Sequence, residues 1–486
     1  MAFQAKHRST IQCIGNFGFY DFNYDGIIRH GPNRTEKNVP IKEKWITQPL
    51  DHFHLYSREW KMRYLENDNY FNGSGPIFIM LGGEWQIGEH YLQSGLIHDI
   101  GFEHGALMYK TEHRFYGKSI VSQYTGVEFL KFLNVDQALA DVAYFIEFIK
   151  EEKNLRDRSV IVFGCSYAGN MAVWMRLKYP HLVQAAYATG APVLAKGNFF
   201  EYMEVVTASY KKHSEECVTE IAKAIKSLEE MLLTEKGLTA IKEQFNFCIL
   251  PDTSTISGYG TLIKILTNKI VGAVQKNNVS YVCQMMTDKS LKTSLQRLAQ
   301  LNRESEDCIR ANYTILVCLM RYEPWHPIIS SQRQWLFQTC TEYGYYPTTD
   351  SDNSMFGAFN VTLEYHTKHC RDVFGKEYNE HFLSRGIKRT NLMYGGKKPD
   401  VRNVLFVNGN RDPWHVLSVL EDLNDSSPSI LIDGSSHCTD LGNFQFSDSL
   451  NLLFARYRIR QIVGKWIQSG YGEFIDPDLK AVRAET

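Results

Sequence analysis

One stretch, residues 159–174, constrains the fold of this chain more than any other. It opens with an apolar, mostly β-branched run at 160–163 (VIVF), which predicts a strand buried on both faces. Ser166 follows among small residues (GCSYAG), and from Asn170 onward the apolar residues recur at helical spacing. A serine at a sharp turn between a buried strand and a helix is typical of a nucleophile elbow. The stretch therefore predicts a nucleophilic serine at position 166.

Two later strands are predicted to end in turns that carry an acid and a base. Residues 403–407 (NVLFV) lead into a turn with Asp412, and residues 429–432 (SILI) lead into a turn with His437. The order serine, aspartate, histidine is that of the α/β-hydrolases, and open α/β sheets place their sites at the C-terminal ends of strands. We expect Ser166 to act as the nucleophile, Asp412 as the orienting acid and His437 as the general base.

Two backbone amides are candidates for an oxyanion hole. Residues 76–81 (PIFIML) predict a buried strand that ends at Gly82 and Gly83. In α/β-hydrolases the residue after the nucleophile supplies one donor, and the loop after an early strand supplies the other. We expect the N–H groups of Tyr167 and Gly83 to fill these roles. An ordinary glycine turn at 82–83 is an equally good interpretation of the loop.

The pattern of elements predicts an α/β-hydrolase core, a mostly parallel sheet with helices on both faces, interrupted by a helical cap. Residues 1–44 are polar and are expected to lie outside the core, whereas residues 45–196 alternate strands with helices. Strand signals fade over 197–335, where helical spacing predicts an all-helical cap insertion. The core is expected to resume over 336–468, before a polar tail at 469–486.

Two further stretches of the predicted core are interpreted as structural. Residues 60–64 (WKMRY) predict an edge strand of the sheet. Glu112, His113 and Arg114 are three ionisable residues in a row beside aromatic residues, a pattern that a functional site also shows. We favour a structural ion pair that holds a loop at this position.

Cysteines and glycosylation sequons indicate the compartment. The chain has ten cysteines and six N-x-[ST] sequons, which together favour a protein of the secretory pathway. The sequons lie at Asn33, Asn72, Asn278, Asn312, Asn360 and Asn424. Residues 1–14 have neither an apolar core nor a cleavage site, so no signal peptide is recognised there. We expect a lysosomal or extracellular protein.

Charge and hydropathy argue against several classes of partner. A net charge of −1 gives no reason to expect nucleic acid, and no apolar run reaches the length of a membrane span. We expect neither a metal nor a cofactor. Five cysteines of the predicted cap could staple it, but their pairing cannot be deduced from the sequence. They are Cys217, Cys248, Cys283, Cys308 and Cys318.

Motifs spread from about residue 45 to 466 resemble one family of serine peptidases. They are QPLDHF (48–53), EHRFYG (112–117), QALAD (137–141), GCSYAG (164–169), YPHL (179–182), NGNRDPW (408–414) and HCTD (437–440). Their identity and order resemble the family of lysosomal prolyl carboxypeptidase, dipeptidyl peptidase II and thymus-specific serine protease. Residues 191–196 and 338–346 resemble the thymus-specific branch in particular.

The resemblance implies a fold, an activity and a disulfide. The implied fold is an α/β-hydrolase core with a helical insertion, in enzymes that are often homodimers and occur in lysosomes or outside cells. The implied activity is hydrolysis of peptide substrates, typically by exopeptidase cleavage after proline, with Ser166, Asp412 and His437 as the triad. The resemblance also implies a disulfide between Cys340 and Cys370.

Two residues depart from the family pattern. Cys165 stands where members usually carry a second glycine, and Trp85 follows Gly-Gly-Glu where many members have another glycine. These departures bear on the level of activity more than on the fold. Two alternative functions stay open: an esterase or lipase, which the serine turn alone would allow, and a catalytically silent relative that acts by binding.

Overall fold

The computed structural model describes residues 39–303, 308–327, 329–357 and 359–470. They form two compact units, which we call the sheet unit and the helical unit. The sheet unit contains residues 39–195, 324–338 and 389–470, and the helical unit contains residues 196–323 and 339–388. Among the described residues, no helix is both long enough and apolar enough to cross a membrane.

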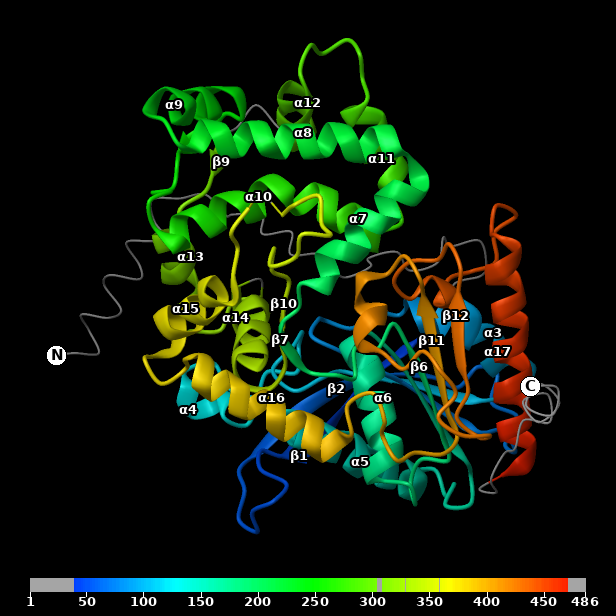
Figure 1. The fold of residues 1–486 in the computed structure, drawn as a ribbon. Coiled ribbons are helices and arrows are strands. Elements are labelled where there is room, and N and C mark those ends of the chain that lie inside the picture. The colour runs from blue at the N-terminus through cyan, green and yellow to red at the C-terminus, as the bar shows by residue number, and fades with distance from the viewer. Residues whose placement is uncertain (1–38, 304–307, 328, 358, 471–486) are drawn as a thin grey trace. The chain divides into compact units, whose positions relative to one another are not determined.

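The sheet unit is built on eight strands in the order β1-β2-β4-β3-β5-β6-β11-β12 (Figure 1). The strands are β1 (Lys42–Pro49), β2 (Glu59–Asn67), β3 (Ile77–Leu81), β4 (Leu107–Thr111), β5 (Val160–Cys165), β6 (Ala185–Thr189), β11 (Val404–Gly409) and β12 (Ser429–Ile432). Strand β2 runs antiparallel to both of its neighbours, and all pairs from β4 to β12 are parallel. The carboxyl ends of these parallel strands therefore meet at one edge of the sheet.

Every residue of β3, β5, β6 and β11 is buried, because helices cover the central strands. Side chains such as Phe78, Phe163 and Val407 pack in one cluster with residues of α3 (Leu96–Glu103) and α17 (Leu450–Ser469). Helix α6 (Tyr167–Lys178) packs against β5 and β6, and also contacts α5 (Val135–Glu152). The shorter or connecting elements are α2 (His90–Gln93), α4 (Val127–Leu130), α14 (Ile329–Gln338) and α16 (Glu380–Tyr394).

The edge of the sheet differs from the sequence prediction. Residues 60–64 lie in β2, the second strand, and the edge strand is β1, which begins at Lys42. The prediction that residues 60–64 form an edge strand is therefore wrong. Strand β1 (KEKWITQP) is polar and mostly solvent-facing, so its sequence lacks the apolar run by which the central strands are recognised. Charged side chains of this kind protect sheet edges from pairing with other chains.

The helical unit consists mainly of α-helices. They are α7 (Glu201–His213), α8 (Glu215–Leu232), α9 (Glu235–Gln244), α10 (Ile256–Gln275), α11 (Val279–Met286), α12 (Ser294–Asn302), α13 (Tyr313–Met320) and α15 (Leu363–Phe374), with a π-helical turn, η1 (Thr339–Tyr343). Two short parallel strand pairs accompany them: β7 (Lys196–Asn198) with β10 (Gly344–Tyr346), and β8 (Phe247–Ile249) with β9 (Ile309–Arg310). The predicted cap is thus mostly but not wholly helical.

Disulfides cross-link the helical unit. Two of them join cap cysteines whose pairing the sequence left open, Cys217–Cys283 and Cys248–Cys308. A third joins Cys340 to Cys370, the pair that the family resemblance implies. Residues 339–388, which contain this disulfide, belong to the helical unit, whereas the core was expected to resume at residue 336.

Candidate active site

Ser166 lies at the turn between β5 and α6. Strand β5 is central in the sheet, paired with β3 and β6, and α6 begins one residue after the serine. Ser166 has φ 61° and ψ −131°, a backbone conformation that residues other than glycine rarely adopt. From Val160 to Met175 it is the one residue that is not buried. The turn thus leaves the serine accessible in an otherwise buried segment.

Two glycines allow this turn to form. A Cβ atom on Gly164 would lie 2.0 Å from the carbonyl oxygen of Ala168, and one on Gly169 would lie 2.8 Å from the Cβ of Ala191. Neither position has room for a side chain, because nonbonded carbon atoms pack at about 3.5–4.0 Å. The glycines of the GCSYAG motif therefore permit the close approach of α6 to β5 and to the segment after β6.

Asp412 and His437 are hydrogen-bonded to each other. Asp412 follows β11, and its Oδ1 accepts a hydrogen bond from the Trp414 N–H at 3.1 Å, which caps the short 3-10 helix η2 (Pro413–Leu417). Its Oδ2 lies 2.6 Å from Nδ1 of His437, and both side chains are buried. A carboxylate only accepts, so Nδ1 carries the proton and Nε2 of the neutral ring is left to act as a base.

A disulfide joins the turn that carries Ser166 (the serine turn) to the loop after β12 that carries His437 (the histidine loop). Cys165 precedes Ser166, Cys438 follows His437, and the two cysteines are bonded with their Cα atoms 6.0 Å apart. No hydrogen bond between the side chains of Ser166 and His437 is present in the described part of the chain; such bonds are often long in unliganded sites. The sequence analysis missed this disulfide. Its signal was the position of two cysteines, each adjacent to one of two predicted catalytic residues.

The glycine loop after β3 is shaped by Trp85. The N–H of Gly82 donates to the carbonyl of Thr111 at 2.9 Å, so this amide extends the pairing between β3 and β4. A Cβ atom on Gly83 would lie 2.6 Å from the indole ring of Trp85. The indole therefore packs directly against residue 83, which must be glycine for this contact to exist.

Two acids in this region, the half-buried Glu84 and the buried Asp440, were not singled out from the sequence. Oε2 of Glu84 is buried and has no hydrogen-bond partner among the described residues. Burial raises the pKa of Glu84 to about 7, opposed mainly by a hydrogen bond from its own backbone. Asp440 accepts hydrogen bonds from the hydroxyl groups of Tyr187 and, at 2.6 Å, Thr189. Burial raises the pKa of Asp440 to about 7 as well. Both carboxyl groups are therefore largely protonated in mildly acidic solution.

A chain of hydrogen bonds fixes the side chain of Tyr167. Its hydroxyl oxygen accepts from Nε2 of Gln338 at 3.0 Å and lies 3.1 Å from Nε2 of His113. Nδ1 of His113 donates to the carbonyl of Arg114 at 2.8 Å, so its Nε2 accepts from the tyrosine. Burial lowers the pKa of His113 to about 4, which keeps the ring neutral. The network orients the residue whose N–H is predicted to bind the oxyanion.

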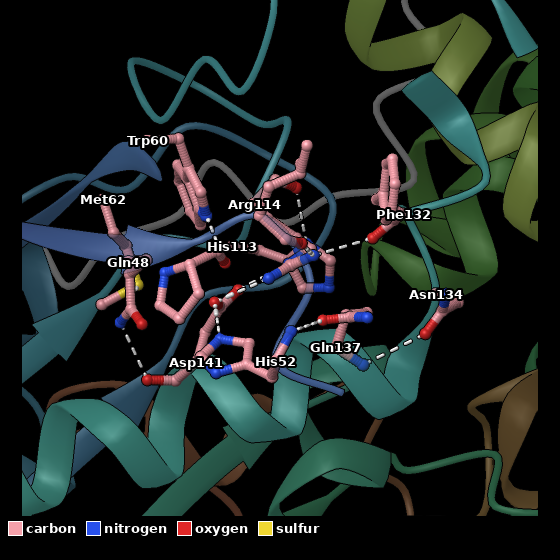
Figure 2. A network of polar contacts seen from close by, with 12 residues as sticks. Gln48, His52, Trp60, Met62, His113, Arg114, Phe132, Asn134, Gln137 and Asp141 are labelled. Atoms are coloured by element: carbon pink, nitrogen blue, oxygen red, sulfur yellow. Dashed lines mark hydrogen bonds and ion pairs between the residues drawn. The ribbon is translucent and has the colours of Figure 1, made fainter. Parts of the chain in front are cut away.

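Figure 2 shows the ion-pair network around Arg114. The guanidinium contacts Asp141 at two points, Nε to Oδ2 at 2.6 Å and Nη2 to Oδ1 at 2.7 Å, and Nε2 of His52 lies 2.7 Å from the same Oδ1. Glu112 is paired with Arg63 in the same way, at 3.0 Å from its Nε. Glu112 and Arg114 are thus each held in a buried ion pair, with Arg63 and Asp141 respectively, as the structural interpretation of this stretch predicts.

The predicted glycosylation positions differ in accessibility. Asn33 lies outside the described residues. Asn72, Asn278 and Asn360 are exposed, whereas Asn312 and Asn424 are half-buried. The Asn424 amide nitrogen, the atom that a glycan would modify, donates a hydrogen bond at 2.8 Å to a backbone carbonyl. The exposed three are therefore better placed for modification.

The described residues also contain one group whose ligand atoms lie close enough for metal binding. It consists of Cys165, His437 and Cys438, with ligand atoms within 4.8 Å of one another. The two sulfur atoms are bonded to each other, so they cannot serve as thiolate ligands.

The fold and site together define a class. The strand order, the strained serine between β5 and α6, and the Asp–His pair after β11 and β12 are those of an α/β-hydrolase, so the predicted fold class is confirmed. The sequence model of the family described as serine carboxypeptidase S28 matches residues 48–459, and the chain belongs to this family. It is therefore a serine-type peptidase.

Curated relatives agree with this assignment. The chain is 33% identical over 465 residues to the thymus-specific serine protease of Mus musculus, and the aligned region covers 91% of this chain and 89% of that protein. It is also 33% identical over 453 residues to the Homo sapiens thymus-specific serine protease, with 88% and 87% covered. Identity to the lysosomal Pro-X carboxypeptidase of Mus musculus is 27% over 453 residues, with 88% and 89% covered. The family resemblance noted in the sequence is confirmed.

Proposed function

We propose that this protein is a serine exopeptidase that cleaves peptides next to proline, with Ser166, His437 and Asp412 as its triad. The observation that carries the proposal is the buried Asp412–His437 hydrogen bond, joined through a disulfide to the accessible turn of Ser166. These three residues come from three separate strand ends on one edge of the sheet, where α/β folds assemble their sites.

The chemistry follows from the roles that this geometry supports. A serine hydroxyl is a poor nucleophile until a base takes its proton. Nε2 of His437 accepts the Ser166 proton as Oγ attacks the scissile carbonyl carbon, and then gives it to the leaving amine as the C–N bond breaks. Asp412 holds Nδ1–H and stabilises the imidazolium. Water then attacks the acyl-enzyme, His437 again moves the proton, and Ser166 is regenerated.

Two backbone amides are proposed to stabilise the tetrahedral intermediate. Tyr167 is the first residue of α6, where N–H groups point out of the helix and the helix dipole favours negative charge. Gly83 lies in the loop after β3, the segment that supplies the second donor in this fold. Loss of one such donor typically lowers kcat by about 10²–10³-fold.

The substrate preference is proposed from the relatives. Curated relatives in Mus musculus, Bos taurus and Homo sapiens are named lysosomal Pro-X carboxypeptidase, and the family itself is described as serine carboxypeptidase S28. These names support peptide substrates with proline beside the cleaved bond, cut from one end of the chain. A lysosomal or extracellular location belongs to the same proposal, supported by disulfides in both units.

A homodimer is part of the proposal as well. Exposed apolar side chains gather just before and along α17 at Phe446, Leu450 and Phe454, which are 100%, 83% and 66% exposed. Apolar side chains repeating on one exposed helix face favour contact with another protein surface. Molar mass in solution tests the point: wild type should be dimeric and Phe454→Glu monomeric, whereas a monomeric wild type would refute the dimer.

The decisive experiment compares two matched proline-containing peptides, one blocked at the N-terminus and one at the C-terminus, with wild type and Ser166→Ala. An exopeptidase should cut one of the two, and the variant should cut neither. If wild type cuts neither peptide from acidic to neutral pH while a fluorophosphonate still labels Ser166, the esterase alternative gains. If the probe also fails on folded protein, the chain is a silent relative.

A further inference from the structure

The Cys165–Cys438 disulfide connects two parts of the sheet that are not neighbours. Cys165 is the last residue of β5, and Cys438 lies in the loop after β12, 273 residues later. Strands β6 and β11 lie between them in the sheet. Neighbouring strands are about 4.8 Å apart, so β5 and β12 are separated by about 14 Å. The disulfide spans 6.0 Å between Cα atoms, so the loop after β12 must fold back over the intervening strand ends.

Two glycines make room for this crossing. At the end of β11, a Cβ atom on Gly409 would lie 2.4 Å from the carbonyl oxygen of Ser435. One residue beyond β6, a Cβ atom on Gly190 would lie 2.9 Å from Nδ1 of His437. The histidine loop therefore runs across the ends of β11 and β6 in direct contact with them. The disulfide fastens its far end to the serine turn.

Two residues with positive φ lie at or next to the ends of this disulfide. Ser166 has φ 61° and Cys438 has φ 51°, both in the region that favours glycine. Such conformations persist only where the surrounding structure fixes them. The carbonyl oxygen of Thr189 is shared by both segments: it accepts the Ser166 N–H at 2.9 Å and lies 3.4 Å from Sγ of Cys438. The turn that carries Ser166 and the loop that carries His437 thus both contact the Thr189 carbonyl and are joined by one covalent bond.

We propose that Cys165 and Cys438 are positioning residues of the peptidase reaction: their disulfide sets the distance between the nucleophile Ser166 and the base His437. The inference rests on the proposed triad. Proton transfer from Ser166 to His437 requires hydrogen-bond reach, and a displacement of about 1 Å in such a site can cost about 10²-fold in rate. The bond therefore acts on kcat, while the substrate-binding surfaces stay in place.

The test measures kcat, KM and the rate of fluorophosphonate labelling for wild type, Cys165→Ala/Cys438→Ala and Ser166→Ala. The double variant should lose about 10²-fold in kcat and in labelling rate, with KM changed less than about threefold. The matched control is Cys248→Ala/Cys308→Ala, which removes a disulfide of the helical unit and should leave the labelling rate unchanged. A folded double variant with wild-type kcat would overturn the proposal.

A second measurement keeps the proposal testable if the double variant does not fold. Wild type is treated with graded dithiothreitol, thiols are alkylated, and the intact fraction of each disulfide is determined by mass spectrometry beside activity. Each reduction takes two electrons and two protons from the dithiol, which itself becomes a disulfide. Activity should follow the intact fraction of Cys165–Cys438. Full activity after reduction of this bond would contradict the positioning role, whereas activity in Ser166→Ala would instead refute the triad.

Discussion

The sheet unit contains two buried histidine–aspartate pairs with nearly the same spacing. His437 lies 2.6 Å from Asp412, and His52 lies 2.7 Å from Asp141. Their surroundings differ. Arg114 binds Asp141 at two points, whereas the other contact of Asp412 is a backbone N–H, and the described residues offer it no cationic partner besides His437. Distance alone therefore does not distinguish a catalytic pair from a structural one.

The charge around each carboxylate makes the difference. Burial alone would raise the pKa of Asp141, but the charge of Arg114 and its hydrogen bonds lower it below the usual value. Arg114 therefore already supplies Asp141 with a permanent positive countercharge. Among the residues that the structure describes, an imidazolium at His437 would be the only positive charge paired with Asp412, so that pair is suited to a reaction that creates this charge.

The most direct test of the difference between the two histidine–aspartate pairs compares Asp412→Asn with Asp141→Asn. We expect Asp412→Asn to lower kcat by about 10⁴-fold, because the amide favours the wrong tautomer of His437. Asp141→Asn should change the kcat of the folded enzyme by less than about tenfold. Peptide hydrolysis under saturating substrate measures both. Equal losses in the two variants would show that the pairs are not functionally different.

Arg114→Met addresses the structural pair. It leaves Asp141 buried without its cation, which should lower the free energy of unfolding by about 3–5 kcal/mol. Urea unfolding measures the loss, and kcat per folded molecule should stay near the wild-type value. Arg114→Lys serves as the control: it keeps the charge but not the two-point contact, and should cost less. A loss of kcat without a loss of stability would point to a catalytic role for Arg114.

Gly190→Ala tests the proposed role of His437 as the general base. The new Cβ would lie 2.9 Å from Nδ1 of His437, at a residue with φ 54°, so the imidazole must move. We expect kcat to fall by about 10²-fold. Gly434→Ala is a matched control, because Gly434 also has a positive φ, 80°, but a Cβ there would meet no atom within 4 Å. Equal losses in both would attribute the effect to backbone strain alone.

The smallest effect expected, because it is measured over only one pH unit, is a pH dependence of stability from Asp440. Its folded pKa of about 7 exceeds the model-compound value of 3.8, so the folded state holds the proton more tightly. Its stabilising contribution is complete below about pH 4 and is lost as the pH rises to about 7, by about 1.4 kcal/mol per pH unit. Thermal or urea unfolding of wild type and Asp440→Asn between pH 5 and 6 measures this difference. Parallel stability curves would refute it.

Much of the site could be predicted because its residues sit where sequence patterns are strong. Ser166, Asp412 and His437 each follow an apolar strand, and their chain order narrows the fold to one class. The edge strand β1 escaped prediction because an exposed strand lacks an apolar run. The extent of the helical unit escaped because residues 339–388 carry no boundary in composition.

Properties that depend on distant parts of the chain could not be predicted. The Cys165–Cys438 bond is set by the crossing of a loop over two strand ends, which no local pattern encodes. The raised pKa values of Glu84 and Asp440 arise from burial by residues far away in sequence. Ser166, Asp412 and His437 therefore stay predicted reactive groups, whereas the disulfide and the burial around them could not be predicted from the sequence.

The long span of this disulfide has a consequence for biosynthesis. A chain made from its N-terminus exposes the Cys165 thiol while Cys217, Cys248 and Cys283 emerge, long before Cys438 exists. Any bond that Cys165 forms with these thiols must be undone by exchange before the native pair can close. Formation of the native Cys165–Cys438 bond therefore requires that any earlier bond of Cys165 be exchanged after residue 438 has been made.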